Sequence, residues 1–234
     1  MVNRLQRYLK FRKQRNEWLA QGGTISRNWI ILSDYDDFSG VAKGAYFHHD
    51  LLVAQFVFRD NPKRHIDIGS RIDGFVAHVA SFREIEVLDV RPFAQCKHEN
   101  ILFEQGDIME PSQLKPADSI SCLNALEHFG LGRYSDPIDV DGHEKGINNL
   151  VQLLIDKGKL YLSVPVGIRD EVHFNAHRIF HPLSILRFPS VERYLNLSRF
   201  DFVDDQGDLH LDIDIHSVIG CTKFGFGIYS FVKS

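Results

Sequence analysis

The sequence predicts a doubly wound α/β domain, with a mostly parallel sheet, helices on both faces and an antiparallel edge strand. Two observations predict this class. Over the first two thirds of the 234 residues, short apolar runs typical of buried strands alternate with longer segments of helical spacing, which favours a parallel sheet. Two later strand-like runs have no clear helix between them, which favours an antiparallel end to the sheet.

The expected elements follow in order along the chain. The apolar run at 50–58 predicts a helix, with Asp50 as a candidate N-cap, and Asn61-Pro62 ends it because proline cannot continue a helix. The expected strands are 65–68, 86–90, 101–104, 119–123, 159–164, 200–203 and 225–231. The expected helices are 75–82 and 146–155, the second of them ended by Gly158.

The N-terminus is basic. Its first sixteen residues hold no acidic side chain and these basic ones: Arg4, Arg7, Lys10, Arg12, Lys13 and Arg15. Leu5, Tyr8 and Leu9 fall near helical spacing, so we expect a basic helical extension over 1–43 and the α/β domain over 44–234. The narrow apolar stripe favours a solvated helix packed across the domain over attachment to an anionic membrane surface or an acidic partner.

Bulk properties limit the possible partners. The formal net charge of -4 provides no basic field for nucleic acid. No apolar run reaches the roughly 18–20 residues of a membrane helix, and no secretory signal is visible, so a cytoplasmic protein is expected. Cys96, Cys122 and Cys221 are far apart and odd in number, which indicates free thiols rather than a disulfide framework or a metal pair.

The strongest motif is HIDIGSRIDG at 65–74. A strand that passes through a glycine turn into a helix is typical of nucleotide sites, because glycine lets the backbone approach the ligand and the helix N-terminus offers N–H groups. Asp89 follows Gly69 by about twenty residues, where a carboxylate can accept both ribose hydroxyls. Asp107, after the third strand, can accept from an adenine amino group. The glycine turn alone would also fit a loop without a ligand.

Several longer segments resemble a known family. HIDIGSRIDGFVAH, LDVRP, DSISCLNALEHFGLGRYSDPID, GKLYLSVPVG and FNAHRIFHP are similar to the uncharacterised domain of unknown function 268, within the class I S-adenosylmethionine (SAM)-dependent methyltransferase superfamily. The resemblance runs from about residue 44 to 205. It implies a Rossmann-like, seven-stranded sheet with an antiparallel last strand, SAM as cofactor, and methyl transfer to an unknown acceptor.

The resemblance also implies a cofactor site. Asp67 and Gly69 would hold the amino-acid end of SAM, Asp89 the ribose and Asp107 the adenine. The full expected set is Asp67, Gly69, Ser70, Arg71, Gly74, Asp89, Val90, Asp107, Ile108 and Asn124. The superfamily's turn normally has three glycines at alternate positions. Here Arg71 and Asp73 take the second and third positions, so Arg71 is expected either to pair with the carboxylate of SAM or to close the pocket.

The loop after the fourth strand carries the candidate catalytic groups. His128 is the candidate base, because an unperturbed imidazole titrates near neutral pH, and Glu127 would orient it or contact the cofactor. Tyr134 and Asp136 complete the catalytic candidates, and Arg133 indicates an anionic acceptor. The alternative is that Glu127 and His128 begin a helix and only brace the loop.

A second polar cluster lies at 173–181. Its three histidines stand at intervals of four, a spacing that would suit a metal on a helix, but Pro182 and the absence of paired carboxylates argue against one. We expect no metal and place Asn175, His177 and Arg178 in the acceptor pocket or in a hydrogen-bonded loop brace. The acidic stretch at 204–214 is expected to be a solvated hairpin rather than a calcium loop.

Two functions remain open on sequence grounds. One is a SAM-dependent methyltransferase for a small polar or anionic acceptor, such as a sugar or another metabolite. The retained aspartates and the polar loop favour this function. The other is a methyltransferase-like domain that has lost catalysis and serves as a binding or assembly module, which the altered glycine turn favours. An enzyme that uses the same pocket for a different nucleotide is a third alternative.

Overall fold

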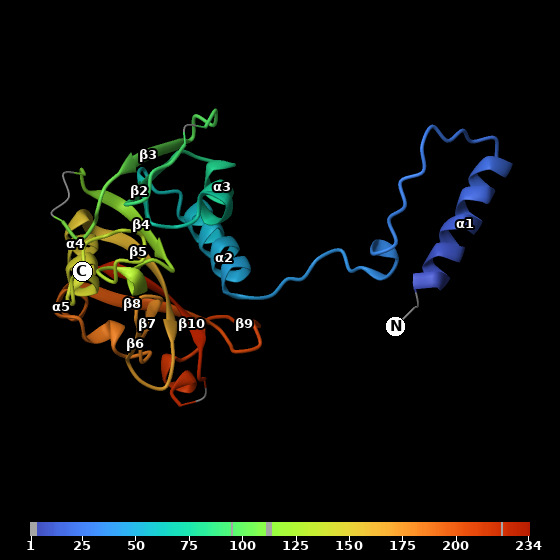
Figure 1. The fold of residues 1–234 in the computed structure, drawn as a ribbon. Helices are drawn as coiled ribbons and strands as arrows, with labels where there is room; N and C mark the ends of the chain where they lie inside the picture. The colour runs from blue at the N-terminus through green and yellow to red at the C-terminus, as the bar shows by residue number, and fades with distance from the viewer. Residues whose placement is uncertain (1–3, 95, 111–113, 221) are drawn as a thin grey trace. The chain divides into compact units, whose positions relative to one another are not determined.

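The computed structural model describes residues 4–94, 96–110, 114–220 and 222–234, and the chain forms two units, Met1–Val41 and Ala42–Ser234 (Figure 1). The first unit contains helix α1 (Arg4–Ala20) and a short 3-10 turn. The second contains the sheet and the helices that cover it. Within the described residues no helix is long and apolar enough to cross a membrane. Cys96 and Cys122 are free thiols, whereas Cys221 lies outside the described residues.

In the described part of the chain, one sheet has eight strands in the order β3-β2-β1-β4-β5-β10-β8-β9. Their bounds are β1 (His65–Ile68), β2 (Ile85–Asp89), β3 (Ile101–Gln105), β4 (Ala117–Leu123), β5 (Leu154–Val166), β8 (Leu195–Val203), β9 (Leu209–His210) and β10 (Gly225–Lys233). Strands β1 to β5 pair in parallel, and β10 lies antiparallel between β5 and β8. The predicted α/β class is confirmed. The hairpin expected at 204–214 contributes β9, which extends the predicted seven strands to eight.

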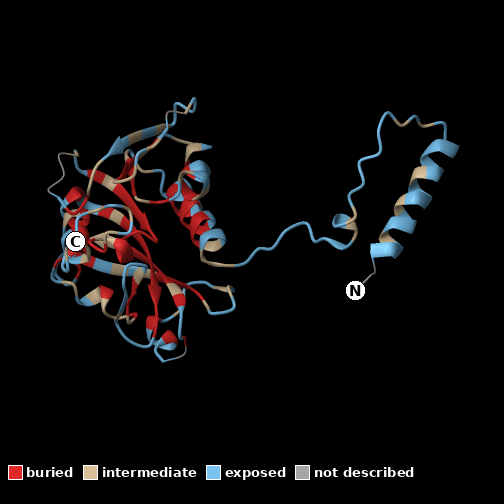
Figure 2. Ribbon diagram, in the orientation of Figure 1, coloured by how far each residue is buried: buried red, intermediate tan, exposed pale blue. Residues whose placement is uncertain are grey.

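Helices cover both faces of this sheet. They are α2 (Ala45–Asp60), α3 (Ala77–Ala80), α4 (Gly142–Leu153) and α5 (Pro189–Tyr194). Residues of α2 and α3 share one buried cluster with Ile228 of β10, and residues of α4 and α5 share another with the adjacent Tyr229. Because successive side chains of a strand point to opposite faces, the two clusters lie on opposite sides of the sheet. Figure 2 shows burial concentrated along the strands and the inner side of α2.

The first helix of the larger unit begins earlier than the sequence suggested. Helix α2 starts at Ala45, with Gly44 at φ +91 as its N-cap, so the prediction that Asp50 caps a helix at 50–58 is wrong. Asp50 is instead a buried residue inside the helix, and its Oδ1 lies 2.9 Å from Nε2 of His49. In the added first part of the helix, Tyr46 and Phe47 are exposed, whereas His49 is buried.

Two other helices also differ from expectation. In place of one helix at 75–82, a π-helical turn at Ile72–Val76 precedes the short α3. The turn breaks at Gly74 (φ -122, ψ -112), where a Cβ would lie 2.5 Å from Oδ2 of Asp50. Helix α4 ends at Leu153, and β5 begins immediately, so Gly158 lies in the strand and does not end the helix.

Candidate functional site

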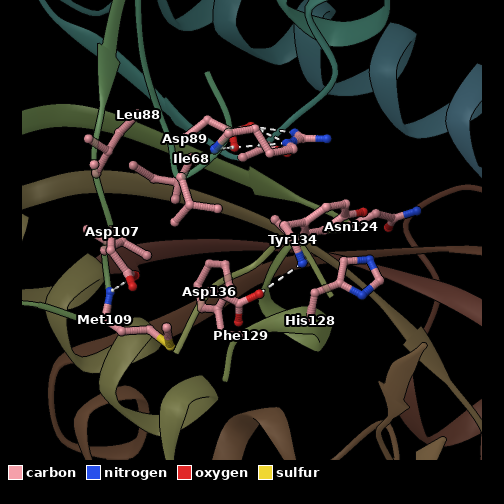
Figure 3. Close-up of a pocket in the computed structure, with 16 residues that line it drawn as sticks. Ile68, Leu88, Asp89, Asp107, Met109, Asn124, His128, Phe129, Tyr134 and Asp136 are labelled. Atoms are coloured by element: carbon pink, nitrogen blue, oxygen red, sulfur yellow. Dashed lines mark hydrogen bonds and ion pairs between the residues drawn. The ribbon is translucent and has the colours of Figure 1, made fainter. Parts of the chain in front are cut away.

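The carboxyl ends of β1 to β4 surround one cavity (Figure 3). This edge is where open α/β sheets bind their ligands. The residues that line it are Ile68, Gly69, Leu88, Asp89, Val90, Arg91, Gly106, Asp107, Ile108, Met109, Asn124, Ala125, His128, Phe129, Tyr134 and Asp136. Local motifs at the strand ends build one wall of the cavity, and the loop after β4 builds the other.

The turn after β1 requires a glycine. Gly69 has φ +73, a conformation that side-chain-bearing residues rarely adopt, and a Cβ there would lie 2.9 Å from Cβ of Ala125. Beneath the turn, the buried Asp67 accepts hydrogen bonds from the Ser70 amide (3.0 Å) and from Oγ of Ser121 (2.6 Å). Burial raises the pKa of Asp67 to about 7. Asp67 therefore shapes the turn from below and does not itself line the cavity.

The predicted ribose carboxylate already has a partner in the chain. Asp89 ends β2, and its Oδ1 accepts hydrogen bonds from the amide (2.8 Å) and Nε (2.9 Å) of Arg91. Nη2 of Arg91 also donates to Asp89 and to the carbonyl of Gly69 (3.1 Å). Its guanidinium carbon lies 4.8 Å from the ring centre of Tyr134. Arg91 thus closes the cavity beside Asp89, and any ligand that uses this carboxylate must displace it.

Apolar side chains line the part of the cavity near Asp107. They are Leu88, Ile108 and Phe129, and Asp107 itself is half-buried just after β3. Oδ1 of Asp107 accepts a hydrogen bond from the Met109 amide (2.8 Å), and burial raises the pKa of this carboxyl. Apolar walls beside a hydrogen-bond acceptor are the lining that a flat aromatic ring with an amino group requires.

Asn124 marks the junction of the two walls. It follows β4 with φ +51, and its Oδ1 accepts a hydrogen bond from Oγ of Ser163 (3.0 Å). Tyr46 of α2 lies close enough to accept a hydrogen bond from the amide nitrogen of Asn124. Burial and the neighbouring Glu127 raise the pKa of Tyr46, whereas that hydrogen bond lowers it.

The loop after β4 buries two titratable groups side by side. Glu127 is 2% exposed, and its Oε2 has no hydrogen-bond partner in the described structure. Burial raises the pKa of Glu127 to about 8. Nδ1 of His128 donates to the carbonyl of Ala176 (2.8 Å), so Nε2 holds the lone pair of the neutral ring, 3.6 Å from Oε1 of Glu127. Burial and the nearby Arg133 lower the pKa of His128 to about 4, well below the neutral range expected for it.

Asp136 holds the same loop in shape. Its Oδ2 accepts hydrogen bonds from the amides of Gly130 (3.1 Å) and Gly132 (3.2 Å), and its Oδ1 accepts one from the Tyr134 amide (3.0 Å). Both glycines have positive φ. Figure 3 shows Asp136 pointing toward the backbone of Tyr134. These bonds occupy both carboxylate oxygens, so the geometry gives Asp136 a role in positioning the loop.

A two-stranded hairpin braces this loop from outside. It consists of β6 (Glu171–His173) and β7 (His177–Ile179). The carbonyl of Ala176 accepts a hydrogen bond from Nη1 of Arg133 (2.7 Å), and Nη1 of the buried Arg178 donates to the carbonyl of Phe129 (2.6 Å). Arg178 therefore supports the loop backbone. No group of three or more potential metal ligands comes together in the residues that the structure describes.

The structure brings half of the predicted site residues to the cavity. The predicted residues that line it are Gly69, Asp89, Val90, Asp107, Ile108, Asn124, His128, Tyr134 and Asp136. The predicted residues that lie outside this lining are Asp67, Ser70, Arg71, Gly74, Glu127, Arg133, Asn175, His177 and Arg178. Arg71 is exposed and pairs with Asp73 (2.8 Å), with its guanidinium 5.6 Å from the ring centre of Tyr46.

Sequence reasoning missed two polar residues of the site. Arg91 was visible in the LDVRP segment, two residues after Asp89, yet only the fold shows that its side chain turns back onto the carboxylate. Tyr46 carried no signal, because its helix precedes the glycine motif and reaches the site only through packing of α2 against the π-helical turn. The apolar lining residues Leu88, Met109 and Phe129 were likewise indistinguishable from core residues.

Comparison with known proteins supports the resemblance seen in the sequence. A family model described as "Caenorhabditis protein of unknown function, DUF268" matches residues 109–191, which confirms the resemblance for the loop and hairpin segments. Among curated proteins, no sequence matches this chain.

Solved structures match over most of the chain. The N-methyltransferase NodS from Bradyrhizobium japonicum WM9, crystallised with S-adenosyl-L-homocysteine (SAH), is 16% identical, with a TM-score of 0.56 over 86% of this chain and 93% of that chain. A TehB-like SAM-dependent methyltransferase from Corynebacterium glutamicum is 15% identical, with a TM-score of 0.54 over 99% of this chain and 100% of that chain. The [4+2]-cyclase SpnF is 13% identical, with a TM-score of 0.56 over 94% of this chain and 92% of that chain. This chain therefore has the fold of the class I SAM-dependent methyltransferases.

Proposed function

We propose that this chain is a SAM-dependent methyltransferase that acts on a small polar or anionic acceptor. One observation carries the proposal: Gly69, Asp89 and Asp107 lie at the carboxyl ends of β1, β2 and β3 and line a single cavity together with apolar side chains. A nucleoside needs these features together, namely a close backbone approach, a carboxylate for its ribose and an acceptor beside its base. That NodS was crystallised with SAH is consistent with a nucleoside of this kind in this fold.

The residues present fit the cofactor. Asp89 would accept the ribose hydroxyls, Asp107 the adenine amino group, and the carbonyl of Gly69 with the amide of Asn124 would hold the amino-acid end. Arg91 must first leave Asp89 and Gly69, since it occupies both. Arg71 stands outside the cavity lining, so it would reach the carboxylate of the cofactor only after releasing Asp73.

The acceptor wall has the groups that methyl transfer requires. When bound, SAM supplies an electrophilic methyl group on its sulfonium. The chain has to orient an acceptor and receive its proton. Arg91 and Arg133 flank Tyr134, with guanidinium carbons 4.8 and 5.4 Å from its ring centre, and this favours an acceptor with negative charge. The lone pair on Nε2 of His128 would accept the proton of the acceptor, and Oε1 of Glu127 lies 3.6 Å from this nitrogen.

A catalytically inactive binding module is the second candidate. The observation that favours it is Arg91, which satisfies the carboxylate that a ribose needs. The similarity to a [4+2]-cyclase also indicates that this fold is compatible with a reaction other than methyl transfer. An enzyme and an inactive module differ in turnover and not necessarily in cofactor binding, so each property needs its own experiment.

Calorimetric titration with SAM, SAH and NAD tests the cofactor. We expect SAM and SAH to bind and NAD to fail. Asp89→Ala should weaken SAH binding by about 2–3 kcal/mol, or roughly 30–150-fold, because two charge-assisted hydrogen bonds are lost. The matched control is Glu104→Ala, which removes an exposed carboxylate from β3. Absence of SAM and SAH binding by the wild-type protein would overturn the proposal.

Turnover separates the enzyme from the inactive module. SAH release can be followed over a panel of hydroxylated, carboxylated and phosphorylated small molecules. We expect an anionic member of the panel to support release, and His128→Ala to lower turnover while SAH affinity stays nearly unchanged, because a base acts in the transition state. Wild-type binding of SAM with no release over the whole panel would favour the inactive module.

A further inference from the structure

The N-terminal unit, described over residues 4–41, contains no buried residue (Figure 2). Large apolar side chains stand exposed along it: Leu9 is 53% exposed, Trp18 57%, Trp29 72% and Phe38 89%. Single exposed apolar residues are normal on a globular surface. A short unit that has no core and concentrates such residues is different, because contiguous exposed apolar patches mark protein or membrane contacts.

Polar contacts hold the unit together on one side of its helix. Nη2 of Arg7 lies 2.8 Å from Oδ2 of Asp36, the Tyr35 hydroxyl donates to Oε1 of Gln14 (2.5 Å), and Nε of Arg15 donates to Oδ1 of Asn28 (3.1 Å). The segment that follows α1 therefore folds back along the helix face that Arg7 and Gln14 share. No apolar packing between described residues is buried in this arrangement.

The opposite face of α1 combines leucines with cations. At 100° per residue, Leu9, Arg12 and Leu19 point away from Arg7 and Gln14, and Lys13 borders them. All four side chains are exposed. Over its whole length α1 holds six Arg and Lys residues against one acidic residue, Glu17. This outer face therefore presents apolar and positively charged groups together.

An anionic lipid surface suits both groups at once. Leucine side chains settle at the boundary between headgroups and acyl chains, while Arg and Lys side chains remain with the anionic headgroups. Nucleic acid would use the cations but leave the leucines exposed to water. The described residues include no helix that could span a membrane, so contact with lipid would be at its surface.

We propose that residues 4–41 form an interfacial anchor that docks this chain on anionic lipid, with α1 in the plane of the surface, Leu9 and Leu19 inserted at the headgroup boundary, and Arg12 and Lys13 against the headgroups. The proposed anchor is argued from residues 4–41 alone, whereas the proposed methyl transfer is argued from the cavity lining of the larger unit. Membrane affinity and cofactor affinity are therefore separately measurable.

Co-sedimentation with lipid vesicles tests this proposal. We expect the chain to sediment with vesicles of equal parts phosphatidylcholine and phosphatidylserine, but not with vesicles of phosphatidylcholine alone. Each basic residue near an anionic surface contributes roughly fivefold in affinity. The double variant Arg12→Glu/Lys13→Glu should therefore lower partitioning by at least roughly 25-fold. The control Lys97→Glu/Lys115→Glu makes the same change of charge in the larger unit and should bind like the wild type.

Other outcomes would overturn the proposal. Equal binding to both kinds of vesicle would contradict the role of charge. Binding to neither kind would contradict lipid as the partner. A molecular mass in sedimentation that rises with protein concentration, together with no vesicle binding, would show that a second copy of the chain covers the outer face. Leu9→Ser/Leu19→Ser provides an independent variant that keeps every charge and should also lose vesicle binding, so the result does not rest on one substitution.

Discussion

The two walls of the cavity are built in different ways. Gly69, Asp89 and Asp107 of the cofactor wall each lie at the end of a strand or within two residues of it. The acceptor wall is assembled from distant segments: His128 is held by the carbonyl of Ala176, and Asn124 by Ser163. A wall made of strand ends is specified by local sequence. A wall made of long-range contacts depends on how loops and hairpins pack.

The walls also differ in how their charges are satisfied. On the cofactor wall the Asp89 carboxylate is paired with Arg91. On the acceptor wall the buried Glu127 has an oxygen without a partner, and its pKa is raised to about 8. An unpaired buried carboxylate lowers the stability of the fold when it ionises. The acceptor wall is therefore the less stable of the two, and substitutions can test this contrast.

The largest effect is expected for Glu127→Gln. In the unfolded chain a glutamate has a pKa of about 4.3. In the folded protein the pKa of Glu127 is higher, about 8. The wild-type protein therefore loses stability as the pH rises from about 4.3, the pKa in the unfolded chain, to about 8. The variant removes this loss, so above about pH 8 it should be more stable than the wild type by roughly 2–4 kcal/mol, with little difference near pH 4. Urea unfolding across this pH range measures it.

Burial also raises the pKa of Asp67, to about 7, so Asp67 adds its own loss of stability as the pH rises. The free energy of unfolding of the variant must therefore be compared with that of the wild type at each pH. Glu144→Gln is the matched control, because Glu144 is exposed on α4. Its stability should follow the wild-type curve. Parallel pH curves for Glu127→Gln and the wild type would show that the Glu127 carboxylate is satisfied in solution.

A smaller effect is expected for Asp136→Ala, which removes three hydrogen bonds from loop amides. By analogy with helix N-caps, the loss should be about 1–2 kcal/mol. Amide hydrogen exchange at Gly130, Gly132 and Tyr134 should accelerate, while SAH affinity falls little because the cofactor wall is untouched. Asp136→Asn should recover part of the protection. Unchanged exchange in the alanine variant would contradict a positioning role.

Asp139→Ala serves as the control in the same loop. Its Oδ1 accepts a hydrogen bond from the Asp141 amide, and its Oδ2 pairs with Lys145, so it does not support the Gly130 and Tyr134 amides through its side chain. Exchange at those amides should therefore remain at the wild-type rate. A general loosening in both variants would mean that the loop responds to any lost charge.

The contrast between the walls also explains what sequence reasoning could reach. Strands and the motif at 65–74 were predictable, because apolar runs bounded by Gly, Pro and Asp are local signals. The position of Asp50 was not, because an acidic residue before an apolar run looks like an N-cap. In the fold it pairs with His49 inside a longer helix and packs against Gly74. Only the tertiary contact distinguishes the two.

The same limit applies to charged residues at the site. Arg71 replaces a glycine of the motif, so it was expected at the cofactor, but the π-helical turn carries it outward onto Asp73. Glu127 and His128 were identified as a pair, yet their pKa values of about 8 and about 4 follow from burial and from Arg133, which no sequence pattern reports. Burial beside a neighbour distant in sequence decides such values.

The smallest effect is expected for Arg91→Ala, and it tests the cofactor wall directly. Because the Arg91 side chain is 37% exposed, its pair with Asp89 should contribute at most about 1 kcal/mol. A ribose that uses Asp89 has to break this pair, so removing it should tighten SAH binding by roughly two- to fivefold. Arg91→Lys should be intermediate, since a lysine cannot form the same forked contact. Calorimetry of both variants shows whether SAH binds more tightly or more weakly than to the wild type. Weaker binding in Arg91→Ala would mean that Arg91 turns onto the ligand and belongs to the cofactor site itself.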